Sequence, residues 1–208
     1  MPSKNTSENL WWSWNHGGIH VLSFSTEHNY SVGSDQYAFI AQDLASVDRS
    51  VTPWLLVQGH KPLYCSTDDY YDCEVTGPIK ELPVLEPLFL KHKVDLALFG
   101  HLHNFERSWP ISGSGKVEQR SYTHAKSPVH VVIGGAGDNE GLTNRWENRS
   151  TEPFPRGNGW SAFHAGSVPS MGWARLTFQN SSWMRLEWVL SASADDKVLD
   201  SFVLTKDR

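Results

Sequence analysis

The sequence predicts an α/β fold of the mixed α+β kind. Apolar runs rich in β-forming residues occupy 19–26, 54–58 and 94–99, and segments with helical spacing separate them. This β-α-β-α-β order predicts right-handed crossovers and a parallel sheet. After Arg107 the helical spacing ends, and the later apolar runs are typical of strands.

The two helices are indicated by their ends as well as by their spacing. Ser34 is a good N-cap, and apolar residues then recur at helical intervals to about Ser46. A second helix is expected over 84–92. Pro83 suits its first turn, while Pro87 favours a kink or a later start.

The carboxyl-terminal part begins with a polar loop over 112–126 and a strand over 129–133. The glycines of 134–137 then indicate a tight turn, because no helical pattern starts there. A hairpin connection is expected at 195–197. Antiparallel strands are expected over 174–178, 183–191 and 198–204.

The composition is typical of one globular domain. Of the 208 residues, 39% are hydrophobic and 12% aromatic, which is enough to form a core. We expect a βαβαβ part over 1–135 and a β-rich part over 136–208. The net charge of −5 argues against nucleic acid or an anionic membrane as a partner. No apolar run approaches the roughly 20 residues of a membrane span.

Histidines follow two of the predicted strands at the point where each strand ends. His60 comes after Gly59, and His101 and His103 come after Gly100. The carboxyl ends of parallel strands meet at one edge of a sheet, where α/β proteins bind ligands. Neutral imidazole is a good ligand for zinc, iron and manganese. The shared edge therefore favours a metal site over the alternative, which is ordinary histidines in turns.

These histidine motifs resemble those of a known family. Residues 57–60 and 100–103 resemble the Val-x-x-His and Gly-His-x-His motifs of the binuclear metallophosphoesterases. The surrounding segments narrow the resemblance to the purple acid phosphatases. These segments are 9–13, 43–49, 59–66, 103–107, 160–163 and 172–177. The resemblance implies a four-layer fold of two mixed β-sheets flanked by helices, of which this chain would supply the carboxyl-terminal half.

The resemblance also implies a metal centre. The family pairs iron(III) with zinc, manganese or iron(II), and a metal-activated hydroxide attacks phosphorus. Carried over by motif, His60 and His101 would bind the divalent ion and His103 the iron(III). The family's Asp-x-Gly, Gly-Asp-x-x-Tyr and Gly-Asn-His motifs, which carry the other ligands, are not found in the 208 residues. We therefore expect part of a longer phosphatase, holding at most one divalent ion by itself.

The function implied is hydrolysis of a small phosphoric monoester, with the oligomeric state undetermined. Two alternatives stay open: a nucleotide pyrophosphatase or phosphodiesterase of the same fold, and a non-catalytic truncated or interaction module. The catalytic groups beyond the metal ligands are unknown. Asn104 and Arg107 directly follow the histidines and are candidate substrate-binding residues. Arg107 either contacts phosphate or pairs with an acid.

Other polar residues near the predicted strands have two interpretations each. Glu27 and His28 end a strand on the active edge, and a solvated loop is favoured over a pocket role. His20 and His130 lie within strands, where a packing role is favoured over a ligand role.

Several features indicate a secreted or lysosomal protein, although the polar first ten residues are not a signal peptide. Cys65 and Cys73 enclose a short loop and form either a disulfide, which needs an oxidising compartment, or two free thiols. Four Asn-x-Ser/Thr sequons are candidate glycosylation sites: Asn5, Asn29, Asn148 and Asn180.

Overall fold

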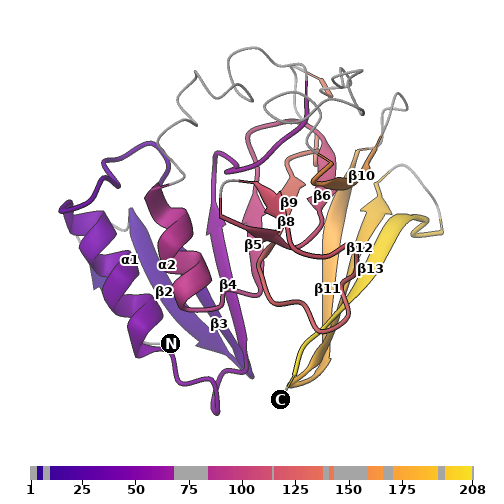
Figure 1. Ribbon diagram of the computed structural model, residues 1–208. Coiled ribbons are helices and arrows are strands. Elements are labelled where there is room, and N and C mark those ends of the chain that lie inside the picture. Colours follow the sequence, from indigo (N-terminus) through magenta and orange to yellow (C-terminus); the bar gives the residue numbers. More distant parts are fainter. Residues whose placement is uncertain are drawn as a thin grey trace.

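A computed structural model of the chain describes residues 4–6, 10–67, 84–113, 115–137, 141–142, 159–165, 171–191 and 195–207. An eight-stranded mixed sheet lies at the centre of this structure (Figure 1). Helices α1 (Asp35–Ser46) and α2 (Glu86–Lys91) cover one face of it. A three-stranded antiparallel sheet covers the other face. The described residues thus form three layers.

The strands of the mixed sheet are, in spatial order, β1 (Lys4–Thr6), β2 (Trp11–His16), β3 (Ile19–Ser23), β4 (Trp54–Gly59), β5 (Leu96–Phe99), β9 (Val129–Ile133), β6 (Phe105–Ser108) and β10 (Ser161–His164). The antiparallel sheet consists of β11 (Gly172–Asn180), β12 (Trp183–Leu190) and β13 (Val198–Thr205). A small separate hairpin pairs β7 (Ile111–Ser112) with β8 (Lys116–Val117).

The middle of the mixed sheet is parallel, as the sequence predicts. Strands β3, β4, β5 and β9 are parallel neighbours, while the strands on either side of them run antiparallel. The register pairs Gly59 of β4 with Phe99 of β5, so these strands end level with one another. The predicted edge at which His60 and His101 meet therefore exists.

The helices form where their capping and spacing indicate. The Ser34 hydroxyl accepts the Tyr37 backbone N–H at 3.1 Å, which caps α1. Ile40 and Leu44 on α1 are buried against the mixed sheet. Pro87 lies in the first turn of α2, which confirms the later start of that helix. Among the described residues no helix is long and apolar enough to cross a membrane.

The second sheet packs its apolar face on the mixed sheet. Trp188 of β12 is fully buried and stacks on Phe105 of β6, with ring centroids 4.7 Å apart. Within the described residues this sheet is antiparallel rather than mixed, and both helices lie on the far side of the other sheet. Strand β10, from the part expected over 136–208, joins the mixed sheet by pairing with β6.

Candidate metal centre

Main-chain pairing brings His60 and His101 to the same place. Strand β4 ends at Gly59, where an added Cβ would lie 2.9 Å from the Phe24 ring, so the position needs glycine. The Gly100 backbone N–H donates to the His60 carbonyl oxygen at 2.9 Å. This bond continues the parallel ladder one residue past both strands, so the two histidines leave the sheet side by side.

The backbone at His101 has an uncommon conformation. Its φ is +67°, in the left-handed region that residues with side chains seldom adopt. Leu102, the residue after His101, packs directly against Gly134 at the end of β9. A Cβ at Gly134 would lie 2.1 Å from the Leu102 carbonyl oxygen. The glycine turn therefore lies beside the site, as expected, and is in close contact with the segment from His101 to His103.

The rings of His60 and His101 converge. His60 Nε2 and His101 Nδ1 lie 3.1 Å apart, and the ring centroids lie 4.8 Å apart. Burial, and then the nearby His101, lower the pKa of His60, which favours the neutral form that binds metals. Two zinc–nitrogen bonds span about 4 Å end to end, so one ion can reach both nitrogens.

His103 lies close by but is oriented differently. Its Nδ1 donates to the Gly141 carbonyl oxygen at 3.1 Å, which assigns the proton to Nδ1 and makes Nε2 the acceptor nitrogen. Metal-binding histidines often have this arrangement. Across the described parts of the chain, no three His, Cys, Asp or Glu side chains lie close enough together to hold one ion. The structure thus brings His60 and His101 together, with His103 adjacent.

A carboxylate and an ammonium group flank His60 at the same edge. The Lys61 ammonium lies 3.1 Å from Glu27 Oε2, and the Lys61 backbone N–H donates to the Thr26 hydroxyl at 3.0 Å. Burial alone would raise the pKa of Glu27, but the hydrogen bonds from Lys61 and Thr26 outweigh it and lower that pKa. The Glu27 side chain is half exposed and His28 is also exposed, consistent with the favoured solvated loop.

The two candidate substrate-binding residues, Asn104 and Arg107, differ in their hydrogen-bond partners. Asn104 is 3% exposed, and its amide nitrogen and oxygen have no hydrogen-bond partner among the described residues. Arg107 donates to both Asp200 oxygens, at 2.6 and 3.0 Å, and to the Tyr122 hydroxyl. Arg107 thus pairs with an acid and links β6 to β13. A buried unsatisfied amide such as that of Asn104 calls for an ordered water or a ligand.

The histidines that lie within strands are packed. His20 is 7% exposed, and its Nε2 lies 2.8 Å from Asp43 Oδ2 on α1. His130 is 4% exposed, and burial lowers its pKa to about 3. The packing role favoured for both is confirmed. Glu106, which no motif in the sequence singles out, is also buried. It lies between Phe105 and Arg107 on β6, and the alternation of side chains along a strand is the signal that places it on the face opposite to theirs.

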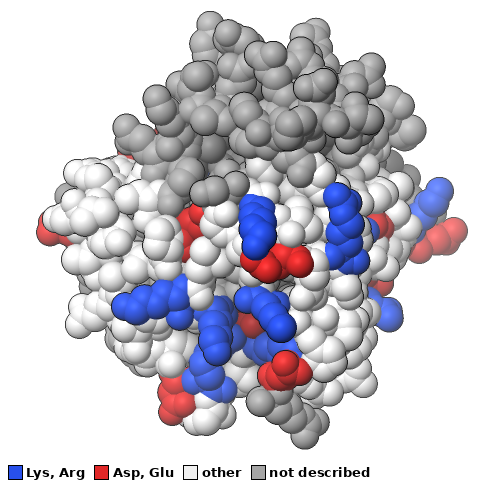
Figure 2. Space-filling view, viewed as in Figure 1, with Lys and Arg blue, Asp and Glu red and all other residues white. Residues whose placement is uncertain are grey.

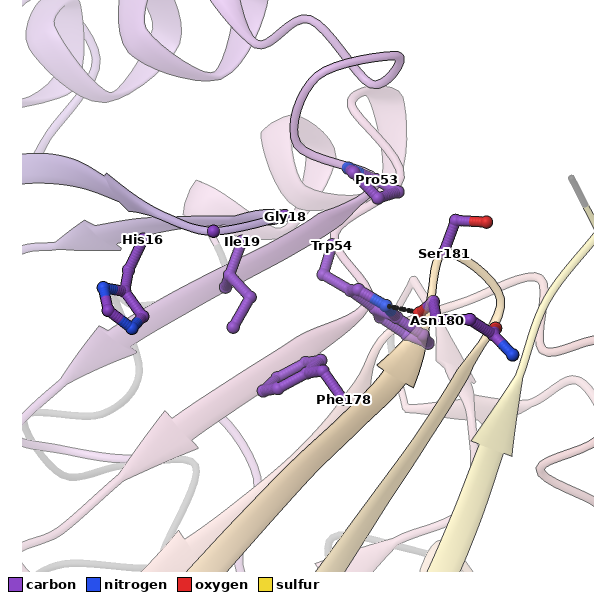
Figure 3. A pocket seen from close by; sticks show the side chains of 9 residues that line it. His16, Gly18, Ile19, Pro53, Trp54, Phe178, Asn180 and Ser181 are labelled. Atoms are coloured by element: carbon purple, nitrogen blue, oxygen red, sulfur yellow. Dashed lines mark hydrogen bonds between the residues drawn. The ribbon is translucent and has the colours of Figure 1, made fainter.

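A cavity of about 390 Å³ opens at the opposite edge, where β3 and β4 begin. Figure 3 shows Trp54 at its centre, donating from Nε1 to the Asn180 carbonyl oxygen at 2.8 Å, with Phe178 and Ile19 beside it. Its lining residues are His16, Gly17, Gly18, Ile19, Pro53, Trp54, Phe178, Asn180 and Ser181. None of the converging histidines lines it, so this cavity is not the metal site.

Comparison with known families identifies the family of the chain. A model of the calcineurin-like phosphoesterases matches residues 5–105, and one described as iron/zinc purple acid phosphatase-like protein C matches residues 127–201. The chain belongs to the purple acid phosphatases. The family resemblance is therefore confirmed. This family implies a binuclear metal centre.

Individual purple acid phosphatases are similar along almost the whole chain. Acid phosphatase type 7 of Danio rerio is 35% identical, with 97% of this chain and 48% of that protein covered. A protein of Arabidopsis thaliana named probable inactive purple acid phosphatase 27 is also 35% identical, with 100% and 32% covered. The chain therefore spans about half or less of these relatives.

A solved structure confirms the fold. Purple acid phosphatase PPD1 from yellow lupin, Lupinus luteus, superposes with a TM-score of 0.79 at 31% identity. The superposition covers 100% of this chain and 34% of the lupin chain. The α/β architecture predicted from the strand and helix pattern is thus that of a metallophosphoesterase.

Proposed function

We propose that this chain supplies one side of a binuclear metal centre that hydrolyses small phosphoric monoesters. The observation that carries the proposal is the 3.1 Å approach of His60 Nε2 to His101 Nδ1 at the carboxyl edge of parallel strands. His60 and His101 would hold zinc, manganese or iron(II), and His103 would hold iron(III). The remaining ligands would come from the three family motifs that are not among these 208 residues.

Bound metal ions supply positive charge for the phosphate and lower the pKa of a bound water. The chain's own residues prepare this chemistry. The Gly141 carbonyl keeps the proton of His103 on Nδ1, so Nε2 can face an ion. Asn104 has a buried amide next to His103, suited to a phosphate oxygen or an ordered water. Arg107 is assigned to holding the two sheets together through Asp200.

A second candidate is a non-catalytic member of the family. One relative is itself named as probably inactive. Within the described residues, no group of three metal-binding side chains is found, and Glu27, the acid that acts on His60, is paired with Lys61. Hard ions such as iron(III) favour carboxylate or phenolate oxygens, so three imidazoles alone would hold at most one divalent ion.

Metal binding by the 208-residue chain tests the proposal. Zinc titrated into the chain should bind at no more than one ion per molecule, and the triple change of His60, His101 and His103 to alanine should abolish binding. His28→Ala is the matched control, because His28 is exposed at the same edge and should be dispensable. Two tightly held ions, or unchanged zinc binding in the triple variant, would contradict it.

Activity is tested in a longer protein that includes the three missing motifs. Hydrolysis of an aryl phosphate should fall by several orders of magnitude in His101→Ala or His103→Ala, the scale expected when a metal clamp is lost. The chain alone should hydrolyse the ester negligibly. A longer protein that cleaves aryl diesters or nucleotide pyrophosphates faster than monoesters would support the phosphodiesterase alternative instead.

We also propose that Cys65 and Cys73 form a disulfide. Cys65 is 3% exposed, and within the described residues no cysteine is a free thiol. Cys73 lies outside the described residues. Non-reducing mass spectrometry of protein secreted from cells should find the joined peptide, whereas two alkylated thiols would contradict both the bridge and the secreted or lysosomal location.

Two of the candidate glycosylation sites are exposed and locally ordered. Asn29 Oδ1 accepts the Ser31 backbone N–H at 3.0 Å, and Asn180 Oδ1 accepts the Ser182 backbone N–H at 2.9 Å. Asn5 lies in β1, and Asn148 lies outside the described residues. We propose glycans at Asn29 and Asn180, which a mass shift on enzymatic deglycosylation of secreted protein would detect.

A further inference from the structure

Glu106 joins the chain segments that follow two of the proposed ligands. The Ser66 backbone N–H donates to Glu106 Oε2 at 2.9 Å, and the Ser66 hydroxyl donates to Oε1. Ser66 lies in the partly buried stretch that follows His60, and Glu106 is the second residue of β6, the strand that follows His103. Glu106 is 4% exposed. These bonds therefore tie the His60 segment to the His103 segment away from the rings themselves.

The Glu106 side chain is held firmly from the strand. On β6, Phe105 stacks on Trp188 and Arg107 bonds Asp200, so both side chains face the second sheet. Glu106 lies between them and faces the other side, because side chains alternate along a strand. Strand β6 is paired with β9 on one side and β10 on the other, so the Glu106 backbone has little freedom.

Charge attraction does not explain the position of Glu106. Burial raises its pKa, the hydrogen bonds from Ser66 and Ser161 lower it only in part, and no charged group of the described residues contributes. A neutral carboxyl group also satisfies both Ser66 contacts: its carbonyl oxygen accepts the N–H, and its O–H donates to the Ser66 hydroxyl, which then accepts instead of donating. A glutamine amide can do the same, with its NH₂ as donor.

We propose that Glu106 is a positioning residue that anchors Ser66 and thereby holds His60 in register with the segment from His101 to His103. This inference rests on the proposed function, because it takes His60 as a metal ligand. His60 itself is exposed, so its placement depends on the segments on either side of it. On its amino-terminal side, strand β4 and the hydrogen bond from Gly100 fix the backbone of His60. On its carboxyl-terminal side, the Ser66–Glu106 contact fixes the end of the segment that follows His60.

The test uses the 208-residue chain and three variants: Glu106→Ala, Glu106→Gln and Ser108→Ala. Ser108 is the matched control, because it is 3% exposed on the same face of β6 and its hydroxyl accepts the His130 backbone N–H rather than a group of the His60 segment. Zinc affinity is measured by calorimetry, and hydrogen–deuterium exchange is measured by mass spectrometry over residues 60–67. Urea unfolding of each variant reports its stability.

Glu106→Ala should weaken zinc binding by about 10–100-fold and speed exchange over residues 60–67. Glu106→Gln should restore both to near the wild-type values. Ser108→Ala should lower stability without changing either. Unchanged affinity and exchange in Glu106→Ala, failure of Glu106→Gln to restore them, or an equal loss of affinity in Ser108→Ala would each overturn the inference.

Failure of the proposed function gives a different pattern. If His60→Ala and His101→Ala bind zinc as the wild type does, the histidines are not ligands and the proposed function fails. The positioning role toward a metal then fails with it. The exchange measurement still decides separately whether Glu106 holds residues 60–67.

Discussion

The two edges of the parallel strands use the same kinds of side chain for different purposes. At the edge where the strands begin, Asp95 accepts hydrogen bonds from Arg49 at 2.7 Å and from Lys206 at 2.8 Å. Lys206 also lies over the Trp54 ring, 3.9 Å from its centroid. At the edge where the strands end, the Lys61–Glu27 pair has an acid that is 50% exposed, compared with 10% for Asp95.

The difference shows where stability and chemistry reside. Figure 2 shows basic side chains gathered in the lower part of the view with acidic ones between them, so the charges on that face are mixed. Lys206, which follows β13, donates to the Pro53 carbonyl oxygen and to Asp95, and so links the end of the second sheet to the mixed sheet. At the other edge the imidazoles of His60 and His101 converge on each other. A bound metal ion would stabilise this arrangement, which by itself adds little to the stability of the fold.

The largest expected effect is at the starting edge. Asp95→Ala should lower the free energy of unfolding by about 3–5 kcal/mol, because it leaves the partly buried Arg49 and Lys206 charges and the Leu55 backbone N–H without their acceptor. Urea unfolding measures the loss, and zinc affinity should not change. A loss below about 1 kcal/mol would show that the two edges do not differ in stability as described.

A glycine at the ending edge should couple stability to metal binding. Gly134→Ala should cost about 1–3 kcal/mol, because the new Cβ meets the Leu102 carbonyl and displaces the segment with His101 and His103. Zinc binding should weaken as well. Gly100→Ala is the control, since its Cβ would find the nearest atoms at 3.8 Å. Equal effects of the two changes would contradict the close-packing argument.

Between the two edges, His130 should make stability depend on pH. Its pKa is about 3 in the folded chain against 6.5 as the ordinary value, so below pH 6.5 the unfolded chain binds a proton that the folded chain does not. This contribution to stability is complete above pH 6.5 and is lost as the pH falls toward 3, by at most about 1.4 kcal/mol per pH unit. His130→Gln should flatten urea-unfolding stability between pH 6 and 5; an unchanged slope would refute the assignment.

The smallest expected effect is at the exposed pair. Glu27→Gln should change the free energy of unfolding by less than about 1 kcal/mol, because Glu27 is half exposed and its pair with Lys61 is screened by water. Thermal unfolding with and without added salt measures it. A loss as large as that for Asp95→Ala would remove the contrast between the edges.

Local patterns were sufficient to predict the core of the fold. The apolar runs that form β3, β4, β5 and β9 and the cap at Ser34 were found from residue type and short-range spacing. The parallel order then placed His60 and His101 at one edge. Strands β2, β6 and β10 were not predicted, because Ser13, Glu106 and similar residues interrupt their apolar character. Partners elsewhere in the fold, such as Asp43 for Ser13, satisfy these polar groups.

The sequence by itself determined the parallel centre, the two helices and the edge that carries the histidines, because these follow from short-range spacing and from the handedness of crossovers. Only the tertiary structure decided the partners. Arg107 faces Asp200 rather than the site, and Asp95 meets Lys206 from the end of the chain. These contacts depend on how two separate sheets stack, and no local pattern encodes which of several charged residues will meet when they do.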